Sequence, residues 1–125
     1  MDSEKRKYVR FLAQETAFAA LRSGFKKVGK VHDISIKGLA FSYMDKAEEL
    51  LSDSDSTNVD IFTSENGFHL ANVPCKVVYD TETSLFTSID TIRTNRCGLQ
   101  FGELPGSQAE QLEYFLKNHT TGIAP

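Results

Sequence analysis

The sequence has few of the features that mark membrane, secreted or metal-binding proteins. No stretch approaches the ~20 consecutive apolar residues of a membrane-spanning helix, and the N-terminus lacks the apolar region of a secretory signal. The two cysteines, Cys75 and Cys97, lie singly in apolar runs, so we expect buried, reduced thiols rather than a disulfide or a metal site. The 125 residues contain three prolines and 40% hydrophobic residues, which predicts one folded domain. Because neither a membrane span nor a secretory signal is recognised, we expect this domain in the cytoplasm.

Motifs of the common enzyme classes are also missing. The sequence contains no GxxxxGK[ST] or GxGxxG phosphate loop and no HExxH motif, so an NTPase, a dehydrogenase or a metalloenzyme is not expected. His32, Asp33 and Ser35 have the residue types of a hydrolytic triad, but neighbours on a strand point to opposite faces and cannot hydrogen-bond in series. We therefore expect no catalytic residues, no metal ion and no enzymatic activity.

Charge is distributed unevenly along the chain. The net charge is -3, yet residues 1–37 hold nine Lys or Arg against four Asp or Glu, whereas residues 38–125 hold five against thirteen. Such asymmetry draws an anionic ligand to one side of a molecule. If the arginines of the N-terminal region stood alone, a solvated basic tail would explain them equally well.

Two short motifs within the basic region point to a more specific ligand. The first places Arg6 and Arg10 four residues apart, and the second, DISIKG, begins at Asp33 after 22 intervening residues. Arginines at this spacing point to one side of a helix or a strand, and their planar N–H forks match phosphate oxygens and the O6/N7 edge of guanine. Asp33 adds an acceptor, Ser35 adds a hydroxyl, and Gly38 allows close backbone approach. The pair predicts an anion and guanine site.

In order and spacing these motifs resemble the RxxxR and (D/N)xSxxG signature of PilZ domains, bacterial receptors for cyclic di-GMP. The segment RCGLQF, residues 96–101, is similar to the RxGxxF strand near the end of such domains. The resemblance covers residues 5–118.

The resemblance implies a cyclic di-GMP receptor rather than an enzyme with a cofactor. The implied ligand-binding residues are Arg6, Arg10, Asp33, Ser35 and Gly38, with Lys5 and Lys7 as additional contacts. Ligand binding would order the N-terminal arm and create a surface for a separate downstream protein, or for a second copy in a homodimer. Family members act in this way in motility, adhesion or exopolysaccharide control.

The fold class expected is mostly β, a six- to seven-stranded antiparallel PilZ-type barrel with a C-terminal α-helix. A flexible arm is expected over 1–10, the barrel over 11–103, the helix over 104–119 and a tail over 120–125, together a single domain over 1–119. Strands are expected in the later part of 11–23 and over 27–35, 38–44, 59–62, 68–79, 83–94 and 95–101, with an acidic connection over 45–57. Strict alternation puts Val31 on the Asp33 face, so a bulge or a covered outer face is needed there, and Ile34 and Ile36 are expected to face inward.

The C-terminal segment changes to helical periodicity. Ala109, Leu112, Phe115 and Leu116 recur at helical spacing, which predicts an amphipathic helix packed on the barrel. Ser107 is the expected N-cap, with Glu110 three residues later as its capping-box partner.

Two other functions compete with nucleotide sensing. The first is a protein-interaction module that keeps the PilZ fold without binding nucleotide. The second is a single-stranded nucleic-acid binder, which needs a basic groove and exposed aromatic side chains. Nucleic acid is the less expected partner, because the net charge is negative and the candidate aromatics are more economically assigned to the core. These are Phe18, Phe41, Phe62 and Phe101.

Overall fold

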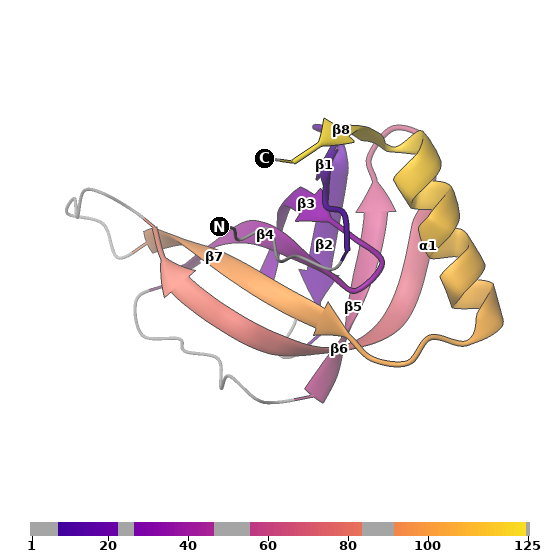
Figure 1. The fold of residues 1–125 in the computed structure, drawn as a ribbon. Helices are drawn as coiled ribbons and strands as arrows, with labels where there is room; N and C mark the ends of the chain where they lie inside the picture. Colours follow the sequence, from indigo (N-terminus) through magenta and orange to yellow (C-terminus); the bar gives the residue numbers. More distant parts are fainter. Residues whose placement is uncertain (1–7, 23–26, 47–55, 84–91, 125) are drawn as a thin grey trace, which may run out of the picture.

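The computed structural model describes residues 8–22, 27–46, 56–83 and 92–124, which form eight strands and one helix (Figure 1). The elements are β1 Phe11–Ala13, β2 Ala17–Leu21, β3 Lys27–Ile34, β4 Gly38–Lys46, β5 Ser56–Thr63, β6 His69–Glu82, β7 Ile92–Phe101, α1 Gly106–Asn118 and β8 Thr120–Ile123. Most of the acidic connection expected over 45–57 lies outside the described residues.

Six of the strands close into an antiparallel barrel. Their order is β2-β5-β6-β7-β4-β3, and pairing of β2 with β3 closes the ring. The predicted barrel is therefore confirmed, and β1 and β8 extend the sheet beside β3. Residues 120–123, expected as part of a tail, are instead a strand, because β8 pairs with β1 and the Ala124 N–H donates to the Arg10 carbonyl oxygen at 2.8 Å.

Alternate side chains of the strands fill the barrel with an apolar core. Phe41 and Phe101 belong to it, and so do Cys75 and Cys97, which are buried and free of any disulfide, as expected. Burial raises the pKa of each thiol to about 12.

Phe18 and Phe62 are not core residues, so their assignment from sequence is wrong. Ala17, Ala19 and Leu21 of β2 point inward and are fully buried, which leaves the alternate residue Phe18 on the outer face. There the half-buried Phe18 ring stacks on Phe62 with centroids 5.9 Å apart.

Helix α1 packs against the barrel beside β6 (Figure 1), as expected. Leu112 and Phe115 are buried, and the Phe115 ring lies 5.4 Å from that of Phe68. The predicted Ser107 cap is wrong because the helix begins at Gly106, two residues earlier than a Ser107 cap requires. Pro105 takes the N-cap position in an extended conformation, with φ -60° and ψ 159°, and its carbonyl accepts the Ala109 N–H.

The last hairpin also differs from expectation. One strand was expected over 83–94 and another over 95–101, whereas β6 continues to Glu82 and β7 runs from Ile92 to Phe101. Residues 84–91 lie outside the described part of the chain. Within the described ranges, no helix has the length and apolar character needed to cross a membrane.

Candidate functional site

One row of four paired residues crosses the outer face of β3, β4, β7 and β6. Asp33 pairs with Ala40, Ala40 pairs with Gly98, and Gly98 pairs with Tyr79. The two middle residues are the smallest available, whereas the outer two are large and polar. The row therefore forms a low floor between two walls.

A bulge in β3 turns Asp33 outward. Val31 pairs with Phe41 and Asp33 pairs with Ala40, so His32 is an extra residue between them. Val31 is fully buried in the core, while the next paired residue faces outside. Of the two alternatives left open from the sequence, a bulge or a covered outer face, the structure shows the bulge.

A second bulge, in β6, turns Tyr79 outward. Val77 pairs with Leu99 and Tyr79 pairs with Gly98, which makes Val78 the extra residue. Behind the bulge the chain is anchored inside the barrel, because both carboxylate oxygens of Asp80 accept the Tyr43 hydroxyl, at 2.6 and 2.7 Å.

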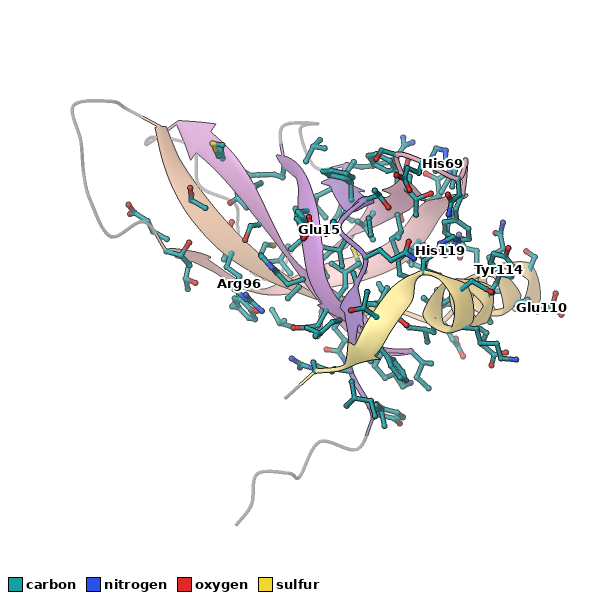
Figure 2. The ribbon with its side chains drawn as sticks, turned by 90° about the horizontal axis from the view of Figure 1, so that it is seen from above. Glu15, His69, Arg96, Glu110, Tyr114 and His119 are labelled. Atoms are coloured by element: carbon teal, nitrogen blue, oxygen red, sulfur yellow. The ribbon has the colours of Figure 1, made fainter. Side chains whose placement is uncertain are left out.

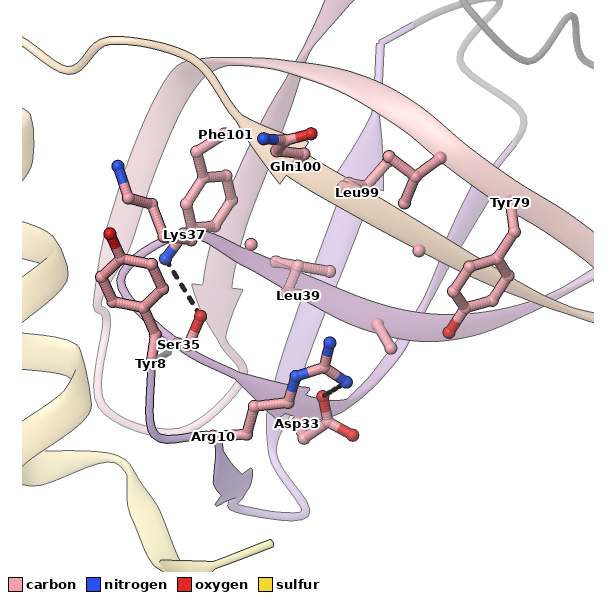
Figure 3. Close-up of a pocket in the computed structure, with 14 residues that line it drawn as sticks. Tyr8, Arg10, Asp33, Ser35, Lys37, Leu39, Tyr79, Leu99, Gln100 and Phe101 are labelled. Carbon is pink, nitrogen blue, oxygen red and sulfur yellow. Dashed lines mark hydrogen bonds and ion pairs between the residues drawn. The ribbon is translucent and has the colours of Figure 1, made fainter. Parts of the chain in front are cut away.

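The row lies in a cavity of about 520 Å³, a volume typical of small-molecule sites, and Figure 3 shows its lining. Tyr79 lies at one end, Tyr8 and Lys37 lie at the other, and Arg10 and Asp33 lie between them. The full lining is Tyr8, Arg10, Asp33, Ser35, Lys37, Gly38, Leu39, Ala40, Val78, Tyr79, Gly98, Leu99, Gln100 and Phe101.

Two arginines share the Asp33 carboxylate. Arg10 Nη1 lies 3.7 Å from Oδ1, and Arg96 Nη2 donates to Oδ2 at 3.4 Å. The Nε of Arg96 also donates to the Tyr79 hydroxyl oxygen at 3.3 Å. Cationic groups and an acceptor are therefore concentrated along one side of the cavity.

The DISIKG motif ends β3 and turns into β4. The Ser35 N–H donates to the Gly38 carbonyl at 2.8 Å, and Ser35 Oγ accepts the Lys37 N–H at 3.0 Å. A Cβ on Gly38 would lie 2.1 Å from the Leu99 carbonyl oxygen, so only glycine fits this close strand contact. Because residue 36 lies in this turn, Ile36 is 46% exposed, and its expected inward orientation is wrong.

The structure brings together four of the residues singled out from the sequence. Arg10, Asp33, Ser35 and Gly38 all line the cavity. Lys5, Arg6 and Lys7 lie outside the described residues, so their expected positions are untested.

Four other polar or aromatic residues were not assigned a ligand role from sequence. They are Tyr8, Lys37, Tyr79 and Arg96. Tyr8 and Lys37 lie inside the two recognised motifs, and the Lys37 ammonium is 5.4 Å from the Tyr8 ring centroid. Arg96 begins the RxGxxF segment, whereas no local pattern marks Tyr79.

His32 does not form a catalytic pair with Ser35. Its Nε2 hydrogen-bonds the hydroxyl of Ser42. Burial, and then the neighbouring charge of Arg96, lower the pKa of His32, which keeps the ring neutral near pH 7. Among the described residues, no three His, Cys, Asp or Glu side chains gather as a metal ion would require.

Comparisons with known proteins agree with this architecture. A family model described as the PilZ domain matches residues 4–118. The structure is similar to that of the PilZ domain of YcgR from Escherichia coli with c-di-GMP, with a TM-score of 0.68 and 13% identity, covering 92% of this chain and 91% of that one. No curated protein sequence matches significantly.

A second solved protein has the same fold within a longer chain. The MrkH–c-di-GMP complex of K. pneumonia matches with a TM-score of 0.68 and 18% identity, covering 93% of this chain and 52% of that one. MrkH in its apo state matches with a TM-score of 0.62 and 18% identity, covering 95% and 50%. The chain thus spans about half the length of MrkH.

Proposed function

The chain belongs to the PilZ domain family, and from this premise we propose that it is a receptor for cyclic di-GMP, which binds in the Asp33 cavity. Its solved relatives YcgR and MrkH are described in complex with this ligand. The proposal gives the chain a sensing role and no catalytic one.

The observation that carries the proposal is the carboxylate of Asp33 held between two arginines at one cavity. A carboxylate accepts hydrogen bonds from the N–H donors of a guanine, while arginine matches phosphate oxygens and the O6/N7 edge. A cyclic dinucleotide presents both kinds of group, and its two negative charges suit a site lined by Arg10 and Lys37, with Arg96 bonded to the lining residue Asp33.

Arg10 is the arginine best placed to move onto a ligand. Its contact with Asp33 is long, at 3.7 Å, and its side chain is 46% exposed, so little stabilisation is lost when it turns away. Arg6, four residues earlier, is proposed to join the same ligand, with Lys5 and Lys7 beside it.

The proposed output is a change in residues 1–10. Each residue that binding orders costs on the order of 1–2 kcal/mol, so the charge-assisted contacts must outweigh this cost before net affinity appears. The arm fixed in this way presents a new surface to a downstream protein or to a second copy. One solved relative is called a c-di-GMP-dependent transcription regulatory factor, but the target of this chain, in motility, adhesion or exopolysaccharide control, is part of the proposal.

Isothermal titration calorimetry with cyclic di-GMP tests the proposal. The unmodified chain should bind saturably, and ligand at about 100 times its dissociation constant should raise the unfolding free energy by about 2.7 kcal/mol. Arg10→Ala should weaken binding at least about tenfold, because it removes a charge-assisted contact. Lys117→Ala, which removes one positive charge from the last turn of α1, is the matched control and should bind normally.

An unmodified chain that shows no heat and no change in melting temperature with saturating ligand refutes the receptor proposal. That result would favour the protein-interaction module. An Arg10→Ala variant that is unfolded without ligand would show that the arginine is structural.

A further inference from the structure

The Tyr79 ring lies flat against the backbone of β7. A Cβ placed on Gly98 would come within 2.2 Å of Tyr79 Cε2 and 2.7 Å of Cδ2 and Cζ. The ring therefore occupies the space that any other residue at position 98 would fill. One face of Tyr79 is covered in this way, while the residue as a whole remains 36% exposed.

Arg96 is held beside this ring by two contacts. Its Nε donates to the Tyr79 hydroxyl, and its Nη2 donates to Asp33, as described above. The two bonds hold the guanidinium between Tyr79 and Asp33. The side chain is 37% exposed, so it can still contact a ligand.

We call the Tyr79 ring at one end of the cavity, with the Arg96 side chain bonded to its hydroxyl, the Tyr79 platform. Tyr8 stands at the opposite end (Figure 3). An aromatic group at each end suits a ligand that carries a base at each end. Bases stack on aromatic rings and on guanidinium planes, whatever hydrogen bonds they make at their edges.

Given the proposed function, on which this inference rests, we propose that the Tyr79 platform stacks on one guanine of cyclic di-GMP. Gly98 is then a positioning residue, because the absence of a side chain there allows the Tyr79 ring to pack flat against β7. The Val78 bulge turns the ring outward, and Asp33 at the other wall is left to accept hydrogen bonds from the ligand.

A pair of substitutions separates the aromatic face from the hydroxyl. Tyr79→Leu keeps an apolar side chain without a ring, and Tyr79→Phe keeps the ring but loses the hydrogen bond from Arg96. Calorimetry should show that Leu weakens cyclic di-GMP binding about 5- to 100-fold, whereas Phe stays within about threefold of the unmodified chain. Gly98→Ala, which keeps both platform residues but displaces the ring, should weaken binding as Leu does.

Fluorescence reports stacking directly, because the chain contains no tryptophan. In Tyr79→Trp the introduced indole is the single tryptophan, and a stacked guanine should quench it saturably with the affinity measured by calorimetry. Tyr114→Trp is the control. Tyr114 is 55% exposed on α1 and lies on the far side of the molecule from Arg96 (Figure 2). The fluorescence of a tryptophan at this position should therefore not change when the ligand is added.

The outcomes distinguish this inference from the proposed function. If the unmodified chain binds and Tyr79→Leu binds equally well, the platform is refuted while the receptor stands. Binding by Tyr79→Trp without quenching refutes it as well. If the unmodified chain does not bind at all, both proposals fail.

Discussion

The Asp60 carboxylate contacts three other residues, Arg22, His69 and Asn72. We predict that it sets the acid stability of the barrel. Arg22 donates from Nε to Oδ1 and from Nη2 to Oδ2, both at 3.1 Å. The Asn72 N–H donates to Oδ1 at 3.0 Å, and His69 Nε2 lies 3.2 Å from Oδ2. Asn72 has a φ of 59°, so the carboxylate also holds a strained residue of β6.

The size of the effect follows from the pKa of Asp60. Burial alone would raise this pKa, but the hydrogen bonds from Arg22, Asn72 and His69 outweigh it and lower the pKa from 3.8 to about 2. A depressed carboxyl pKa stabilises the folded state above the unfolded value and loses that effect as pH falls. At 1.36 kcal/mol per pKa unit, about 2 kcal/mol is lost between pH 4 and pH 2, and about half of it by pH 3. The Asp60 side chain is 11% exposed, but that of Arg22 is 40% exposed, so solvent screens the pair and about 2 kcal/mol is an upper value.

Urea unfolding of the unmodified chain and of Asp60→Asn, each at pH 7 and pH 3, measures the effect. Asparagine keeps the shape but carries no charge, so the variant should be less stable by about 2 kcal/mol at pH 7 and by about 1 kcal/mol at pH 3. Glu113→Gln, at an exposed position on α1, is the control and should leave the difference between the two pH values unchanged. Equal stability of Asp60→Asn and the unmodified chain at pH 7, or a difference that does not shrink at pH 3, would refute the reasoning.

Three further predictions concern packing. Gly38→Ala puts a Cβ 2.1 Å from the Leu99 carbonyl oxygen and should cost about 1–3 kcal/mol, read as a lower melting temperature; an unchanged one would contradict the close strand contact. Phe115→Ala should cost about 3–5 kcal/mol in urea unfolding, because the helix loses its fully buried anchor, and a cost below 1 kcal/mol would show that the helix is dispensable. Cys75 and Cys97, buried and with pKa values of about 12, should resist a thiol reagent at pH 8 and react once urea unfolds the chain; fast labelling of the folded protein would place them outside the core.

The barrel was predictable because its strands alternate apolar and polar residues, and the helix because its apolar side chains recur at helical spacing. The irregularity in β3 could be anticipated in part, since Val31 and Asp33 would share one face of a regular strand, and either a bulge or a covered outer face was needed to accommodate both. Part of the candidate site followed from the two sequence motifs, because Arg10 lies in the first and Asp33, Ser35 and Gly38 lie in the second.

The features that the sequence did not predict depend mostly on pairing between segments that lie far apart in the sequence. Residues 120–123 include three β-branched residues, but so short a segment does not define a strand alone, and it becomes one because β1 offers it a free edge. Ser107 has the right pattern for a cap, but the position of Pro105 decides where the helix starts. No local sequence pattern marks Tyr79 as a ligand contact. Its proposed role follows only from the fold, in which it pairs with Gly98 on the next strand.

Two bulge residues, His32 and Val78, account for the form of the cavity. Without the extra His32, Asp33 would share the inward face with Val31, and without the extra Val78, Tyr79 would point into the core and Asp80 would point out. The two bulges lie on β3 and β6, the strands that flank β4 and β7, and so they raise one wall on each side of Ala40 and Gly98. A regular six-stranded barrel of the same composition would turn both Asp33 and Tyr79 inward. The candidate site therefore depends on the two bulges.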